Sequence, residues 1–135
     1  ARNASVNGPS IDVTALNAGN DGLCVEVTAG TITDGTHAFK LQDSIDGGTT
    51  WVDVAAPYLQ TPTGQTSSFT SGTTAGSTIK LGYLGNANVG TIANSASPTG
   101  GKILVRLVAT VTGATTGGIY SAVAALGHSF SMAAA

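Results

Sequence analysis

The stretch from Phe39 to Val54, FKLQDSIDGGTTWVDV, decides the fold class of this chain. Apolar and polar residues alternate on both sides of a central DGGT cluster, which is the period of strands with one buried face. The adjacent glycines Gly47 and Gly48 supply the positive φ angles that a tight antiparallel reversal requires. The stretch therefore predicts a β-hairpin.

The turn of this hairpin also matches a named pattern. It spells Ser-x-Asp-x-Gly-x-Thr-Trp, which resembles the Asp-box of sialidases and other glycan-active β-propellers; the matching residues are Ser44, Asp46, Gly48, Thr50 and Trp51. In such a turn the carboxylate and hydroxyls hydrogen-bond the turn backbone, and the tryptophan caps the nearby core. We interpret the motif as a structural turn that does no chemistry.

A sialidase propeller is the least favoured interpretation of this motif. Such a fold needs several blades of about 40 to 50 residues each, together with an arginine cluster for the substrate carboxylate. This chain has 135 residues, one copy of the pattern and only two arginines, Arg2 and Arg106. We therefore expect no sialidase-type hydrolase.

Charge is scarce along the whole chain. Five basic and seven acidic residues make 9% of the sequence and a net charge of -2, where a typical soluble domain has about 25% charged residues. Such a surface has no basic stripe with which to attract nucleic acid or anionic lipid. Weak charge repulsion suits a surface that neighbouring subunits cover. We expect no nucleic-acid partner.

Alternation elsewhere predicts an all-β fold, an antiparallel β-sandwich or jelly roll formed by one domain. The strand at 102–111 is apolar on both faces, which indicates a central position, and the small residues of 119–126 permit close packing. The other predicted strands are 11–15, 23–28 and 78–84. The expected organisation is an extended arm at 1–9, a sandwich at 10–126 with long loops at 61–77 and 85–101, and a tail at 127–135.

The arm, the loops and the tail lack a periodic apolar pattern. These segments are rich in Thr, Ser and Gly, and they have too few apolar residues to bury enough surface to become ordered on their own. We therefore expect them to be mobile or held by a partner. Phe69 either anchors in a pocket of a partner or folds back over its own core. The residues we single out as contacts with a partner are Arg2, Phe69, Val89, Ile92, Phe130 and Met132.

The candidate catalytic and metal-binding residues are few. His37 and His128 have no carboxylate or cysteine at ligand spacing, and the single Cys24 excludes an intrachain disulfide and zinc sites built on paired cysteines. The aspartates Asp43, Asp46 and Asp53 offer oxygens for Ca²⁺ but do not match an EF-hand loop, so we interpret them as solvated turn carboxylates. We expect no catalytic residue, metal or cofactor. We expect Arg106 to pair with an acidic neighbour across the sheet, with contact to a partner subunit as the alternative.

Nothing in the sequence indicates a membrane protein. The most apolar runs are shorter than the about 20 residues that a spanning helix needs, and Arg106 interrupts one of them. The first residues lack the basic start and apolar middle of a signal peptide. We therefore expect no membrane partner and no secretion signal.

Several segments are similar to the head decoration, cement or minor capsid proteins that tailed bacteriophages encode beside the major capsid protein. The segments are TITDG at 31–35, the hairpin at 39–54, LGYLG at 81–85 and KILVRLVATVTGATTGGIYSAVAALG at 102–127. The chain departs from the family in an insertion at 86–101, in its arm and in its tail. The resemblance implies binding to the outside of an icosahedral head, as trimers or other clusters at the junctions between capsomers.

Two functional hypotheses follow. The first is a structural protein, made in the bacterial cytoplasm and located on the capsid exterior of the virion, that cross-links major capsid subunits and associates with itself. The alternative is a carbohydrate- or receptor-binding module displayed on the virion. The Asp-box pattern and four aromatic residues suggest this second role: Trp51, Tyr58, Tyr83 and Tyr120.

Overall fold

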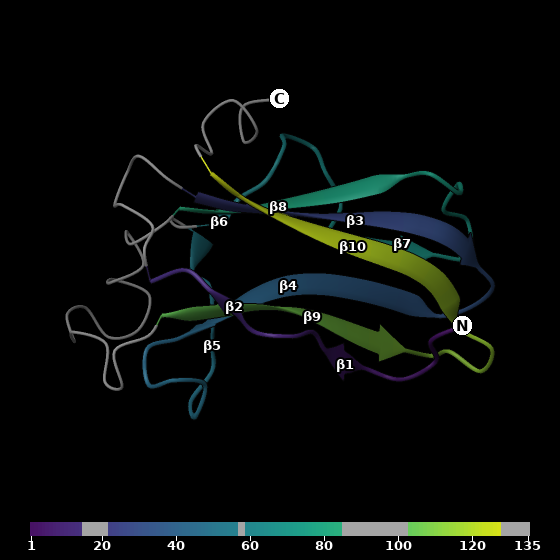
Figure 1. The fold of residues 1–135 in the computed structure, drawn as a ribbon. Coiled ribbons are helices and arrows are strands. Elements are labelled where there is room, and N and C mark those ends of the chain that lie inside the picture. The colour runs from purple at the N-terminus through teal and green to yellow at the C-terminus, as the bar shows by residue number, and fades with distance from the viewer. Residues whose placement is uncertain (15–21, 57–58, 85–102, 128–135) are drawn as a thin grey trace.

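The computed structural model describes residues 1–14, 22–56, 59–84 and 103–127, and these residues form two antiparallel β-sheets packed face to face (Figure 1). The predicted all-β antiparallel sandwich is therefore confirmed. The predicted loop at 85–101 and the predicted tail, apart from Gly127, lie outside the described residues.

Each sheet has one long central pair of strands. Sheet A runs in the order β10 (Gly118–Gly127), β3 (Gly22–Ile32), β8 (Thr78–Leu84) and β6 (Leu59–Gln60). Sheet B is built around β9 (Leu104–Thr112) and β4 (Thr36–Ser44); β1 (Val6–Asn7) and β2 (Ile11–Asp12) pair with the far side of β9, while β5 (Val52–Asp53) and β7 (Ser68–Thr70) pair with β4. The central position predicted for the strand at 102–111 is confirmed, because β9 has partners on both sides.

The core lies between the two sheets. Strand residues point alternately to the two faces of a sheet, and the apolar positions of β3, β8, β4 and β9 meet in this layer. Its centre includes Val27, Leu41, Leu81 and Val105, which are all fully buried. Burial of such side chains is the main favourable contribution to folding.

The predicted hairpin is confirmed as the pair β4–β5. Gln42 lies opposite Asp53 and Asp43 lies opposite Val52, and the connecting turn passes through Gly47 and Gly48 with φ angles of 72° and 93°. The strand predicted at 11–15 is shorter than expected, because only Ile11–Asp12 pairs with β9. The strand predicted at 23–28 is longer and reaches Ile32.

The expectation that the arm at 1–9 needs a partner chain for its order is wrong. Arg2 forms a two-way backbone bridge with Gly118 of β10, and Val6 lies opposite Ala109 of β9. The arm thus connects the edges of both sheets within one chain. Its backbone groups find partners at strand edges, a contact between distant segments that no local pattern reveals.

The loop at 61–77 is also held by its own domain. The side-chain amide of Gln65 donates to the carbonyl oxygen of Lys80 at 2.8 Å and accepts from its N–H at 2.7 Å. Phe69 lies in β7 with 2% of its surface exposed, and its ring meets the Phe39 ring edge-on with centroids 5.2 Å apart. The predicted contact of Phe69 with a partner is therefore wrong, because the ring fills its own core.

Candidate functional site

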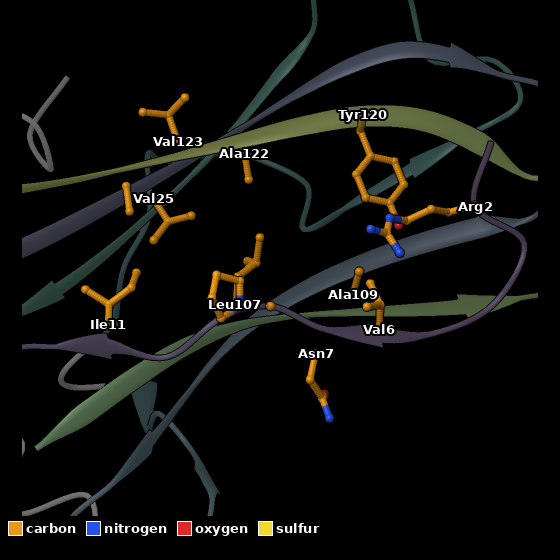
Figure 2. Close-up of a pocket in the computed structure, with 13 residues that line it drawn as sticks. Arg2, Val6, Asn7, Ile11, Val25, Leu107, Ala109, Tyr120, Ala122 and Val123 are labelled. Carbon is orange, nitrogen blue, oxygen red and sulfur yellow. The ribbon is translucent and has the colours of Figure 1, made fainter. Parts of the chain in front are cut away.

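An apolar groove opens along one side of the sandwich. It lies between β10 of sheet A and the β1, β2 and β9 strands of sheet B, and its cavity volume is about 290 Å³. Figure 2 shows Ala122 and Val25 projecting from sheet A toward Ile11 and Leu107 of sheet B. At one end Tyr120 lies near Arg2, which brings a cation to an otherwise apolar lining.

The groove exists because β10 presents small side chains to the interior. Ala122 and Ala124 line it and remain exposed, although alternate residues of β10 face sheet B. A methyl group is too short to fill the space between two sheets whose backbones lie about 10 Å apart. The predicted close packing of 119–126 is therefore wrong for these residues, and the sandwich stays open at this edge.

Strand β10 is itself an exposed edge. Its large apolar side chains Ile119, Val123 and Leu126 are 57%, 69% and 54% exposed, and residues 118–127 include no charged side chain. Among the described strands only β3 flanks it in sheet A, and beyond the Arg2 bridge at Gly118 its outer edge pairs with no other described strand. Natural proteins usually protect such an edge with charge, proline or a covering loop. An unprotected edge above an apolar groove is suited to binding an extended polypeptide.

Tyr120 joins this surface to the core. Its ring meets Phe39 and His37 edge-on, with centroids 5.0 Å and 5.5 Å apart. Burial raises the pKa of its hydroxyl, because the phenolate would lose water contact. The hydroxyl has no hydrogen-bond partner among the described residues.

Comparison of the chain with protein-family models, with curated proteins and with solved structures finds no match. The described part of the chain contains no helix with the length and hydropathy needed to cross a bilayer. These comparisons therefore supply no functional assignment.

A network of hydrogen bonds holds the Asp-box-like turn. The Asp46 carboxylate accepts hydrogen bonds from the backbone N–H groups of Thr49 and Thr50 at 3.0 and 2.8 Å and from the Ser44 hydroxyl at 2.7 Å. The Ser44 hydroxyl oxygen in turn accepts from Gly48 N–H at 2.9 Å. The Thr50 N–H bond is the leading cause that holds the pKa of Asp46 well below its usual range. The turn network follows the interpretation made from the sequence.

Trp51 completes the turn. Its indole N–H donates to the Gly48 carbonyl oxygen at 2.8 Å, and the guanidinium of Arg106 lies over its ring at 4.2 Å from the centroid. The prediction that Arg106 pairs with an acidic neighbour is wrong. Its guanidinium donates instead to the side-chain oxygen of Gln42, at 3.0 and 2.8 Å. Trp51 is half-buried, and Arg106 occupies one face of the ring.

Of the remaining predicted contact residues, Arg2 is the one that the structure describes. Arg2 is exposed and lines the groove, as described above. Val89, Ile92, Phe130 and Met132 lie outside the described residues, as does His128.

The predicted solvated state of the hairpin aspartates is wrong for Asp43. Its carboxylate is buried and accepts a hydrogen bond from the Tyr83 hydroxyl at 3.4 Å. Asp53 accepts from Lys40 at 2.8 Å and from Gln42 at 2.7 Å, and the Lys40 bond is the leading cause that lowers the pKa of Asp53. Within the described ranges no three His, Cys, Asp or Glu side chains gather as a metal site would require.

The other two titratable candidates, His37 and Cys24, are buried. His37 is fully buried between the sheets, and its Nε2 lies 3.1 Å from the Asp34 carbonyl oxygen. Cys24 is buried in β3, and this burial raises the pKa of its thiol. Desolvation disfavours a thiolate, so Cys24 is a poor nucleophile.

The groove beside β10 is the feature that the sequence pattern does not predict. Residues 119–126 carry an apolar pattern typical of a strand, and that pattern alone does not distinguish a core strand from an exposed edge. One signal was available: Ala122 and Ala124 alternate where a core strand usually has Val, Leu or Ile. Small residues at inward positions indicate a layer that is left unfilled.

Proposed function

We propose that this chain is a structural protein that binds the outer surface of a tailed-bacteriophage head and cross-links neighbouring capsid subunits. The observation that carries the proposal is the uncharged, exposed strand β10 above an open apolar groove. Exposed apolar patches and unprotected strand edges on a domain indicate sites that bind other polypeptides. The partner proposed, the major capsid protein, is the one that the resemblance of four sequence segments to head decoration proteins implies.

The mechanism of this role is cross-linking. A domain that contacts two subunits adds interface that must be broken before those subunits separate, and it resists the outward pressure of packaged DNA. Two contacts on one rigid body also reinforce each other, because release of one leaves the other in place. The weak net charge of -2 removes a source of repulsion between closely spaced copies on the shell.

Co-sedimentation tests the proposal. The purified chain is mixed with empty heads assembled from the major capsid protein of the same genome, and bound protein is measured against input. We expect saturable binding at a fixed number of copies per head. Binding that never saturates, or no binding, would contradict the role.

The tail provides a matched pair of variants for the same assay. Phe130→Ser with Met132→Ser removes the two large apolar side chains at 128–135, whereas Ser129→Ala with Ser131→Ala changes the interleaved residues and keeps them. We expect the first pair to weaken binding at least tenfold and the second to leave it unchanged. Equal affinities of the two double variants for heads would show that the tail does not contact the head.

A carbohydrate-binding module displayed on the virion is the second candidate. The observation that favours it is Trp51, whose half-buried ring has Arg106 over one of its two faces. The other aromatic candidates contribute less: Tyr83 is fully buried, and Tyr58 lies outside the described residues. A glycan array in which Trp51→Ala abolishes a specific signal would support this role, and an array without signal for the unmodified chain would reject it.

A further inference from the structure

The outer edge of β10 has a defined length. At its start, Arg2 occupies the edge at Gly118 through two backbone hydrogen bonds of 2.7 and 3.0 Å. From Ile119 to Gly127 no strand in the described part of the chain pairs with this edge. The unpaired stretch is therefore nine residues long, and its midpoint is Val123.

We infer that this edge binds β10 of a second copy of the chain, antiparallel, about a two-fold axis at Val123. The pairing would join the two A sheets into one continuous sheet across the dimer. Backbone groups of each edge would then receive the hydrogen bonds that solvent now supplies. A two-fold contact of this kind closes on itself, so it gives a dimer and no fibre.

The side chains favour this register. With the axis at Val123, the two Val123 side chains become direct neighbours on the outer face, where a β-branched pair packs well. On the inner face Leu126 of each copy lies opposite Tyr120 of the other, so both exposed leucines meet an aromatic ring. The remaining pairs, Ser121 with Ala125 and Ala122 with Ala124, are small and let the backbones approach.

The charges near the interface do not oppose the pairing. Glu26 is the β3 residue opposite Val123, and its carboxylate lies 3.7 Å from the Lys80 ammonium of its own chain. In the dimer the two Glu26 side chains would be three strand spacings apart, about 14 Å, which exceeds the screening length of about 8 Å at physiological salt. The two Arg2 residues would lie at opposite ends of the paired strands, because the strands run antiparallel.

This inference goes beyond the proposed function. It assigns the edge of β10 to a second copy of the chain, so a dimer that binds heads would do so through the groove and its other surfaces. It concerns two copies of one chain in solution, without heads. A chain that dimerises and fails to bind heads would refute only the capsid role, and a monomer that binds heads would refute only the dimer.

Molar mass in solution tests the dimer. Size-exclusion chromatography with light scattering on the full chain should give the mass of two chains at about 100 μM. Val123→Lys places a like charge on each side of the axis and should return the mass of one chain. Thr110→Lys adds the same charge at an exposed position of β9 in sheet B and should leave the dimer intact.

Cysteine cross-linking tests the register. Val123→Cys places two thiols at a directly opposed pair, within the Cα separation of about 4.4–6.8 Å that a disulfide requires. Ser121→Cys is the matched control, since the two copies of residue 121 would be offset by four residues, about 13 Å along the strand. Mild oxidation should cross-link the first variant and leave the second monomeric on a denaturing gel. Both variants retain Cys24, so any bridge through that thiol appears in both.

Four outcomes would overturn the inference. They are a single-chain mass for the unmodified protein at about 100 μM, a mass of three or more chains, an unchanged dimer in Val123→Lys, and equal cross-linking of the two cysteine variants. Because Val123 is exposed, its substitution leaves the core untouched. A thermal unfolding curve for each variant verifies that the fold is retained.

Discussion

Asp34 and Asp46 fix the turns at the two ends of strand β4 by accepting backbone hydrogen bonds. Asp34 accepts from the N–H groups of Thr115, Thr116 and Gly117 in the turn between β9 and β10, and the bond from Thr116 is the leading cause that lowers its pKa. This carboxylate therefore joins two turns that are about 80 residues apart in sequence. Single side chains of this kind hold the sandwich together at the end where the arm also crosses.

Replacement of Asp34 by Asn should lower the melting temperature at pH 7. The amide oxygen is uncharged and is a weaker acceptor for three N–H groups than the carboxylate. The pKa of Asp34 is lower in the folded protein than in the unfolded chain. Its stabilisation is therefore complete above the unfolded value of about 3.9 and is lost as the pH falls through the folded pKa.

Thermal unfolding followed by circular dichroism between pH 2 and pH 7 checks this prediction. The difference between the unmodified chain and Asp34→Asn should be largest at neutral pH and shrink below about pH 4. Asp53→Asn is the control, because Asp53 forms an exposed ion pair with Lys40 and such pairs contribute little. A difference for Asp34→Asn that stays constant with pH would show that its charge has no part in the effect.

Phe69 provides a second test at the residue scale. Because its ring is buried against Phe39, Phe69→Ala should reduce the free energy of unfolding of the isolated chain by about 3–5 kcal/mol. Urea denaturation measures this loss, with exposed Thr70→Ala as the control in the same strand. A free energy of unfolding equal to that of the unmodified chain would place the ring outside the core.

At the scale of elements, local alternation predicts which segments are strands, and contacts between distant segments decide what each strand faces. The β4–β5 hairpin and the central strand β9 can be predicted from their own residues. A DGGT cluster between alternating segments is typical of a hairpin turn, and a strand that is apolar on both faces is typical of a central position. The pairing of the arm with β9 and the partner of Arg106 depend on register between segments about 60 to 100 residues apart. No local pattern encodes that register.

The exposure of β10 is the element-scale feature that local pattern conceals, and it supports a prediction about packing. Ala124→Val should raise the free energy of unfolding by about 1 kcal/mol, since added methyl groups at this position enter the groove and a β-branched residue favours a strand. Ala125→Val is the matched control on the outer face, where the same atoms meet solvent.

Urea denaturation of both variants, performed at a concentration too low for self-association, compares the two faces. A gain from Ala125→Val as large as that from Ala124→Val would contradict the description of the groove as unfilled apolar space. It would attribute both effects to strand propensity alone.

For the whole molecule, the open groove and the large exposed apolar side chains of the described residues lie on one side of the sandwich. The arm and strand β10 lie there (Figure 1) and line the groove, whereas the Asp-box-like turn lies at the far end of β4. The β-sandwich can be predicted from the sequence, which also shows directly that charged residues are scarce. The sequence does not predict the open side, because that side arises where small residues of one strand face the edge of another sheet. A domain of this design is suited to assembly with other chains.

The temperature at which empty heads open, measured by light scattering, tests the cross-linking role most directly. Heads saturated with the chain should open at a higher temperature than bare heads, and the increase should follow the fraction of sites occupied. Heads that bind the chain fully and open at the temperature of bare heads would contradict the proposed role, because a cross-link that adds no resistance to separation is no cross-link.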